Sequence, residues 1–64
     1  MEEVRIWCQQ IDKVTGEIIG KMQSVMTYPN IKSAFRDFDI FEIETETFRQ
    51  EVVAVSKDCP FATN

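Results

Sequence analysis

Asn-Ile-Lys-Ser-Ala-Phe-Arg-Asp-Phe, residues 30–38, is the one stretch of this chain with the periodicity of a helix. Its apolar side chains recur at the i, i+3, i+4 and i+7 spacing of a single helical face, at Ile31, Ala34, Phe35 and Phe38. Pro29 suits a helix entry, because the N–H that proline lacks has no partner in the first turn. Either Thr27 or Asn30 is a suitable N-cap. The segment therefore predicts an amphipathic helix that covers the strands on either side of it.

The part of the chain before this helix has the pattern of a β-hairpin. Residues 4–12 and 17–26 are rich in the β-branched and aromatic residues that favour strands. The loop between them contains Gly16, and glycine adopts the left-handed conformation that such a four-residue loop needs at little cost. We therefore expect Asp12 to face Glu17, which in turn places Ile11 opposite Ile18 and Trp7 opposite Met22.

The two faces of this hairpin differ in polarity. We expect the helix to cover the face that carries Trp7, Ile11, Ile18 and Met22. The other face is half apolar, with Gln10, Lys21 and Gln23 interrupting the apolar set Val4, Ile6, Cys8, Ile19 and Val25. This second set is either an interface, such as a homodimer made by stacking two sheets, or a surface that the last strand or the tail covers through Phe61. Tyr28 is either an exposed aromatic anchor or part of a packed corner.

A change of period marks the region after the helix. Residues 40–48 alternate every second position, with Phe41, Ile43, Thr45 and Thr47 on one side and Glu42, Glu44 and Glu46 on the other. This predicts a third strand. Residues 52–55 are a further β-prone run, so residues 48–51 form either a loop before a fourth strand at 51–57, which we favour, or a bulge in one continuous strand. Residues 58–64 have no periodicity and are expected to form a loosely ordered tail.

These elements predict a single small α+β domain over residues 1–64. Its antiparallel sheet would consist of the N-terminal hairpin plus one or two C-terminal strands, with one α-helix on one face, in the order ββαβ or ββαββ. A single helix covers one face only, so the other face is solvated, paired with itself or bound to a partner.

Composition excludes several classes of function. The chain has no histidine and only two cysteines, Cys8 and Cys59, so we expect no metal site, no cofactor and no imidazole-dependent catalysis. The net charge of −4 argues against direct nucleic-acid binding. No apolar run reaches the length of a membrane span, and the first residues lack the basic and apolar regions of a signal peptide. We therefore expect a cytoplasmic, non-enzymatic protein with free thiols.

The strongest candidate for a binding surface is acidic. Glu42, Glu44 and Glu46 would project from one strand face at ~6.7 Å intervals, with Asp37, Asp39 and Glu51 nearby in the sequence. A row of carboxylates spaced in this way resembles backbone phosphates, and it would bind the basic groove of a nucleic-acid-handling enzyme. In size, charge and order of elements the chain is similar to small phage-encoded proteins that inhibit host enzymes, including inhibitors of bacterial RNA polymerase. That similarity implies an inhibitor that acts by protein–protein interaction.

Two other functions follow from different residues. A homo-oligomeric structural or interaction protein would use the half-apolar face of the hairpin, Val4, Ile6, Cys8, Ile19 and Val25. A redox-responsive protein would use Cys59, although nothing near it in the sequence lowers the pKa of a thiol. The alternative reading of the glutamates is a solvated strand face whose like charges prevent edge-to-edge aggregation.

Overall fold

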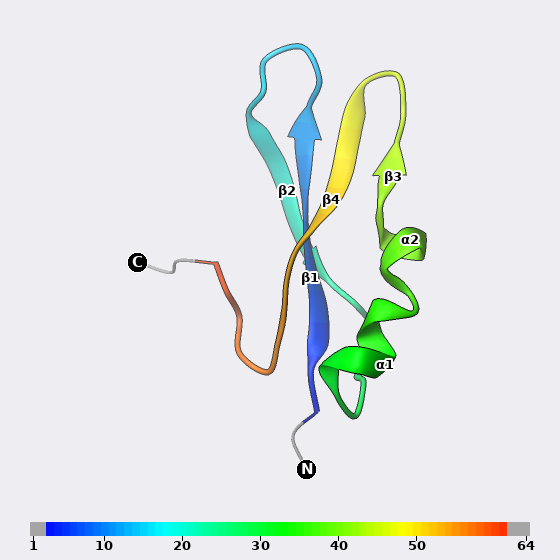
Figure 1. The fold of residues 1–64 in the computed structure, drawn as a ribbon. Coiled ribbons are helices and arrows are strands. Elements are labelled where there is room, and N and C mark those ends of the chain that lie inside the picture. Colours follow the sequence, from blue (N-terminus) through cyan, green and yellow to red (C-terminus); the bar gives the residue numbers. More distant parts are fainter. Residues whose placement is uncertain (1–2, 62–64) are drawn as a thin grey trace.

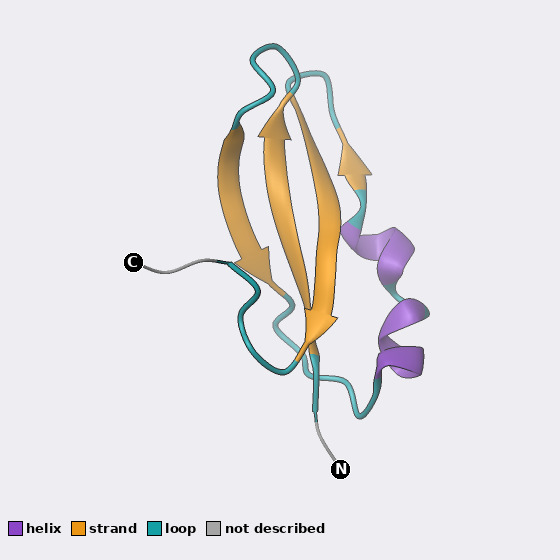
Figure 2. Ribbon diagram, turned by 60° about the vertical axis from the view of Figure 1, so that its left-hand side comes forward, coloured by secondary structure: helices purple, strands orange, loops and turns teal. Residues whose placement is uncertain are grey.

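A computed structural model describes residues 3–61 of the chain (Figure 1). Four strands form one antiparallel sheet in the order β2-β1-β4-β3. Two short helices follow the first hairpin and lie on one side of the sheet (Figure 2). The elements are β1 (Arg5–Asp12), β2 (Ile18–Gln23), α1 (Ile31–Phe35), α2 (Phe38–Phe41), β3 (Ile43–Glu44) and β4 (Phe48–Ser56). The molecule is thus a small α+β fold, with two short helices where the sequence predicts one.

The first hairpin turns as the sequence predicts. Gly16 has a positive φ of 78°, and its N–H donates to the carbonyl oxygen of Asp12 over 2.8 Å. The Asp12 carboxylate closes the loop by accepting hydrogen bonds from the N–H groups of Val14 and Thr15. Asp12 donates to Glu17 across the base of the loop. A left-handed glycine and an acidic side chain that holds the turn therefore define this end of the sheet.

The predicted register of β1 and β2 is right only next to the loop. Ile11 lies opposite Ile18, but Gln10 then lies opposite Gly20, so Ile19 is an extra residue in β2. This bulge shifts every later pair by one position, and Trp7 lies opposite Gln23 rather than Met22. Because strand side chains alternate between faces, the shift moves Met22 to the Cys8 side of the sheet.

The helices cover the opposite face of β1 from the one predicted. The core is a cluster of Val4, Ile6, Cys8, Tyr28 and Ala34, with Phe38, Phe41, Val52 and Val55 packed against it. We call this side of the sheet the helix face. Trp7, Gln9 and Ile11 alternate with the core residues of β1 and point to the other side, which we call the open face. The prediction that the helix covers Trp7 and Ile11 is therefore wrong. Ile6 and Cys8 lie beneath the helices instead, and both are fully buried.

The predicted helix begins where expected and ends early. Asn30 is the N-cap, and its side-chain oxygen accepts a hydrogen bond from the Ser33 N–H over 2.8 Å. Thr27 instead donates to the Glu3 carboxylate. The helix breaks at residues 36–37, and Phe38 begins α2 rather than ending α1. Both Ala34 and Phe38 still contact the core, so the apolar spacing is used by two helices instead of one.

The region predicted as a strand over residues 40–48 is divided among three structures. Ile40 and Phe41 belong to α2, only Ile43 and Glu44 form β3, and residues 45–47 make the turn into β4. The Thr45 hydroxyl group accepts hydrogen bonds from the N–H groups of Thr47 and Phe48, while the Thr45 N–H donates to the Phe48 carbonyl. The prediction of two C-terminal strands is confirmed, but the predicted loop at residues 48–51 is wrong because those residues are already part of β4.

The chain after β4 turns back onto the open face. The Phe61 ring lies edge-on to Trp7, with ring centroids 6.2 Å apart, and the Lys21 ammonium group lies 5.2 Å from the Phe61 centroid. The Trp7 indole N–H donates to the Ser56 carbonyl over 3.0 Å. The described part of the tail, residues 57–61, thus covers Trp7; residues 62–64 of the predicted tail lie outside the described residues.

Candidate functional site

A shallow depression on the open face collects half of the predicted acidic surface. Its volume is about 520 Å³ and it lies between β3 and β4. The residues that line it are Glu42, Ile43, Glu44, Arg49, Gln50 and Glu51. Glu44 is paired with Arg49 across the two strands, and both lie on the same side of the sheet as Glu51 and Gln9. The depression therefore contains three carboxylates and one guanidinium group.

Glu44 is held in place by a lysine from the first hairpin. The Lys13 ammonium group donates to the Glu44 carboxylate over 2.8 Å and to the Thr45 carbonyl over 3.1 Å. The hydrogen bond from Lys13, together with its positive charge, lowers the pKa of Glu44 below the ordinary value. Glu44 therefore stays ionised to a lower pH than a free glutamate, and the two hairpin turns are tied together at this end of the sheet.

Glu51 is also oriented by its neighbours. The Gln9 side-chain amide of β1 donates to the Glu51 carboxylate over 3.1 Å. The Arg49 guanidinium lies 3.5 Å from the same carboxylate, two residues away along β4. Arg49 remains about half exposed, so its charge offsets only part of the negative charge in the depression. Gln50 points the other way, where its amide donates to the Phe41 carbonyl and accepts from Gln10.

Glu42 and Glu46 are exposed, and neither takes part in an ion pair among the described residues. Glu42 follows α2 in an extended conformation, so it lies on the same side as Glu44, two residues further on. Glu46 lies in the turn between β3 and β4. The predicted straight row of three glutamates is therefore wrong, because the strand ends at Glu44 and the chain turns back through Thr45.

The two aspartates predicted for this surface lie elsewhere. Asp37 sits between the helices, and its carboxylate accepts a 2.7 Å hydrogen bond from the Tyr28 hydroxyl group. This hydrogen bond, with a smaller effect of burial, raises the pKa of Tyr28. Asp39 is exposed on α2. Neither aspartate lines the depression, so the structure brings together Glu42, Glu44 and Glu51 and separates them from Asp37 and Asp39.

The residues predicted as an oligomer face do not form one surface. Val4, Ile6 and Cys8 lie in the core beneath the helices, whereas Ile19 and Val25 are exposed at 56% and 93%. Placing an interface on these five residues is therefore wrong. Tyr28 is buried in the same core and is not an exposed anchor.

The two cysteines are unpaired and differ in environment. Burial, followed by the negative charge of Glu42, raises the pKa of the Cys8 thiol. Cys59 is exposed in the tail, and its sulfur lies 4.0 Å from the Phe61 carbonyl oxygen.

Arg49, Lys13 and Gln9 are the site residues that sequence reasoning missed. All three reach the acidic residues through strand pairing or loop contact. Lys13 is 31 positions from Glu44 in the sequence, and Gln9 is 42 positions from Glu51. The signal that would have found Arg49 is the turn at Thr45, which sets Glu44 opposite Arg49. Without that turn, the alternation of glutamates gives no indication of a cation among them.

Within residues 3–61, no group of three acidic, cysteine or histidine side chains is arranged to hold a metal ion. Nor is any helix in the described part of the chain long and apolar enough to cross a membrane. Comparison with known proteins gives no significant match: no family model fits the chain, and no curated protein and no solved structure is detectably similar.

Proposed function

We propose that this protein is a non-enzymatic binding module whose acidic depression holds basic side chains of another protein. The observation that supports the proposal best is the convergence of Glu42, Glu44 and Glu51 on one solvent-exposed depression of the open face. The helices lie on the opposite side of the sheet, so a partner reaches these carboxylates without any rearrangement of the core (Figure 2).

The arrangement suits arginine or lysine side chains from a partner. Glu44 and Glu51 are held in fixed positions by Lys13 and Gln9, so binding costs little side-chain entropy at those two residues. Glu42 has no ion-pair partner among the described residues and offers a free carboxylate for a charge-assisted hydrogen bond. Arg49 restricts the direction of binding, because its positive charge repels the cation of a partner. That cation must therefore approach the glutamates from the side away from Arg49.

The class of partner that we propose is a nucleic-acid-handling enzyme. Such enzymes carry basic grooves for phosphates, and a protein with a net charge of −4 is attracted to them at long range. With its carboxylates in the groove, the module would exclude nucleic acid and so inhibit the enzyme by competition. This mechanism requires no chemistry from the module itself.

The test uses two variants with the same change in charge. Tagged wild-type protein, E42Q/E44Q and the control E17Q/D58N are each used to capture proteins from a bacterial lysate at low and high salt. We expect the wild type and the control to retain a basic nucleic-acid-binding protein at low salt, and to lose it at high salt. E42Q/E44Q should lose it at both.

Mass spectrometry identifies the captured protein, and its nucleic-acid binding is then measured with and without added module. We expect the wild-type module to displace nucleic acid when its concentration is high enough to saturate the captured protein. Equal capture by E42Q/E44Q and the wild type would show that the depression is not the binding site.

A further inference from the structure

A second hollow adjoins the acidic depression on the open face. Its volume is about 220 Å³, and it lies between β1, β4 and the loop of the first hairpin. The residues that line it are Ile11, Asp12, Lys13, Gly16 and Arg49. Arg49 also lines the acidic depression, so the two hollows share one wall. Small-molecule pockets measure about 300–1,000 Å³. The second hollow therefore suits a single side chain better than a whole ligand.

The strand registers place the two hollows side by side across the sheet. Glu44 of β3 lies opposite Arg49 of β4, which lies in turn opposite Ile11 of β1. Ile11 lies opposite Ile18 of β2, and all four side chains are on the open face. The row thus runs from a carboxylate, through a guanidinium group, to two aliphatic side chains. Glu44 and Ile11 are two strand spacings apart, which is roughly 10 Å.

The charged side chains around the second hollow are engaged outside it. The Lys13 ammonium group donates to the Glu44 carboxylate, and the Arg49 guanidinium lies beside the Glu51 carboxylate. The Asp12 carboxylate accepts from two N–H groups of its own loop. Lys13 and Arg49 therefore present their methylene stems to the hollow, as long basic side chains do when their charged ends are held elsewhere. The hollow is consequently apolar, although three of its lining residues carry charges.

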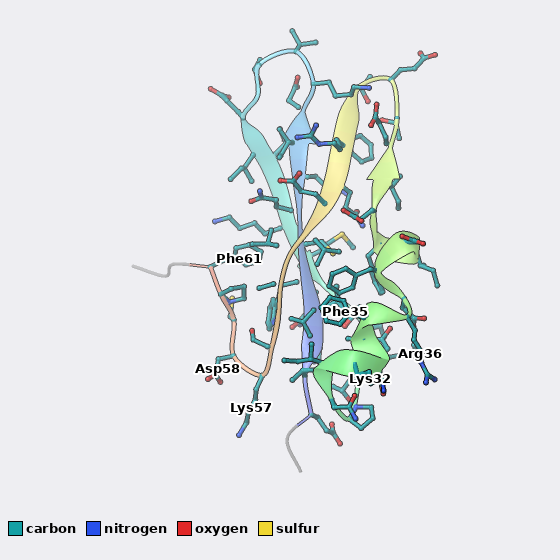
Figure 3. All side chains as sticks on the ribbon, in the orientation of Figure 1. Lys32, Phe35, Arg36, Lys57, Asp58 and Phe61 are labelled. Carbon is teal, nitrogen blue, oxygen red and sulfur yellow. The ribbon has the colours of Figure 1, made fainter. Side chains whose placement is uncertain are left out.

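The second hollow is open in the single chain. Ile11 is only half-buried, and Ile18 beside it is 52% exposed. The tail covers Trp7 instead, and Lys57 in the tail lies at the opposite end of the sheet from the two turns (Figure 3). Within residues 3–61, no tail residue lines the hollow. The apolar end of this row is therefore accessible to the same partner as the acidic end.

We propose that the partner segment that binds the acidic depression carries a large aliphatic side chain beside its basic residues, and that this side chain occupies the second hollow. The inference rests on the proposed function, because the acidic depression sets where the segment lies. A segment of basic residues alone would leave Ile11 and Ile18 in water, whereas an aliphatic side chain would bury apolar surface on both sides of the contact. The second hollow thus selects among basic segments.

The test uses two capped nine-residue peptides as probes. Both have arginine at the second and fourth positions of a glycine host, and they differ in having leucine or serine at the sixth and eighth. In an extended peptide these two positions lie about 7 and 13 Å beyond the nearer arginine, on either side of the spacing between Glu44 and Ile11. NMR titration of the isotope-labelled protein at low salt gives each Kd. The leucine peptide should bind the wild type about three- to tenfold more tightly than the serine peptide.

Ile11→Val and Ile11→Thr form a matched pair of variants. Both keep a β-branched residue of similar size in the strand, and they differ in a methyl or a hydroxyl group facing the hollow. The advantage of leucine should persist in Ile11→Val and disappear in Ile11→Thr. The serine peptide should bind both variants as it binds the wild type, which also shows that both are folded. E42Q/E44Q should bind neither peptide.

The outcomes separate this inference from the proposed function. A leucine peptide that binds the wild type no more tightly than the serine peptide would overturn the inference, while the serine peptide still tests the depression. An undiminished leucine advantage in Ile11→Thr would overturn it as well, because the leucine would then lie elsewhere. Binding of the serine peptide that is the same in E42Q/E44Q and the wild type would instead overturn the proposed function. Failure of both peptides to bind the wild type would overturn both.

Discussion

The helix face and the open face of the sheet are made by alternate residues of the same strand, yet they differ in almost every property. Ile6 and Cys8 of β1 are fully buried beneath the helices. Gln9, the residue after Cys8 in β1, points to the open face, where its side-chain amide donates a hydrogen bond to the Glu51 carboxylate. Trp7 on that face is covered by Phe61 of the tail. A chain of 64 residues has enough apolar side chains to seal one face of a sheet, so the other face is left to charged and polar groups.

The largest effect is expected from truncation on the helix face. Ile6→Ala should lower the free energy of unfolding by about 2–5 kcal/mol, because Ile6 is fully buried and the cavity is enclosed by the core. Ile18→Ala, the matched change on the exposed edge strand, should cost less than about 1 kcal/mol. Urea denaturation of both variants measures the difference.

A milder change covers the case in which Ile6→Ala does not fold. Ile6→Val should cost about 0.5–1.5 kcal/mol and leave the sheet intact. A loss at Ile6 no greater than the loss at Ile18 would mean that the two faces are not distinguished by burial.

An intermediate effect is expected where the tail meets the open face. Phe61→Ala removes the edge-on contact to Trp7 and should cost about 0.5–1.5 kcal/mol. Trp7 is the only tryptophan, so its fluorescence should shift to the red as water reaches the ring. Cys59→Ala is the control, since Cys59 is exposed and should change neither signal. An unshifted spectrum in Phe61→Ala would show that something other than Phe61 shields Trp7.

The first hairpin could be predicted because its signal is local. Gly16 specifies the loop within a few residues and takes the predicted left-handed conformation, and Asp12 faces Glu17 as predicted. The choice of face could not be predicted in the same way. Val4, Ile6 and Cys8 on one side and Trp7 and Ile11 on the other are both apolar enough for a core. The predicted pairing of Trp7 with Met22 favoured the wrong side, because the sequence does not show that Phe61 folds back over Trp7.

The C-terminal half was harder to predict because its turn is formed by side-chain hydrogen bonds and not by residues typical of turns. Residues 45–48 lack glycine, proline, asparagine and aspartate, yet the Thr45 hydroxyl group makes the turn. The extra residue at Ile19 has a weak mark in the sequence, the neighbouring Gly20, because a glycine inside a strand often accompanies a bulge. Consequently the three glutamates that line the depression, Glu42, Glu44 and Glu51, could be listed from the sequence, whereas their geometry and the neighbouring cation, Arg49, depended on a turn that composition does not reveal.

The smallest effect is expected at the charged edge of the open face. The lowered pKa of Glu44 means that its carboxylate is favoured in the folded chain. Its contribution to stability is therefore present above the ordinary glutamate pKa of 4.5 and is lost as the pH falls through the lower value of the folded state. Because the Lys13 and Glu44 side chains are both exposed, the change in the free energy of unfolding should be small.

The direct measurement is an NMR titration of the Glu44 carboxyl carbon in the wild type and in Lys13→Gln. Removing the ammonium group should return the pKa of Glu44 toward the ordinary value. If the titration of Glu44 is the same in both proteins, Lys13 does not hold this carboxylate, and the open face loses one of the two contacts that fix its glutamates.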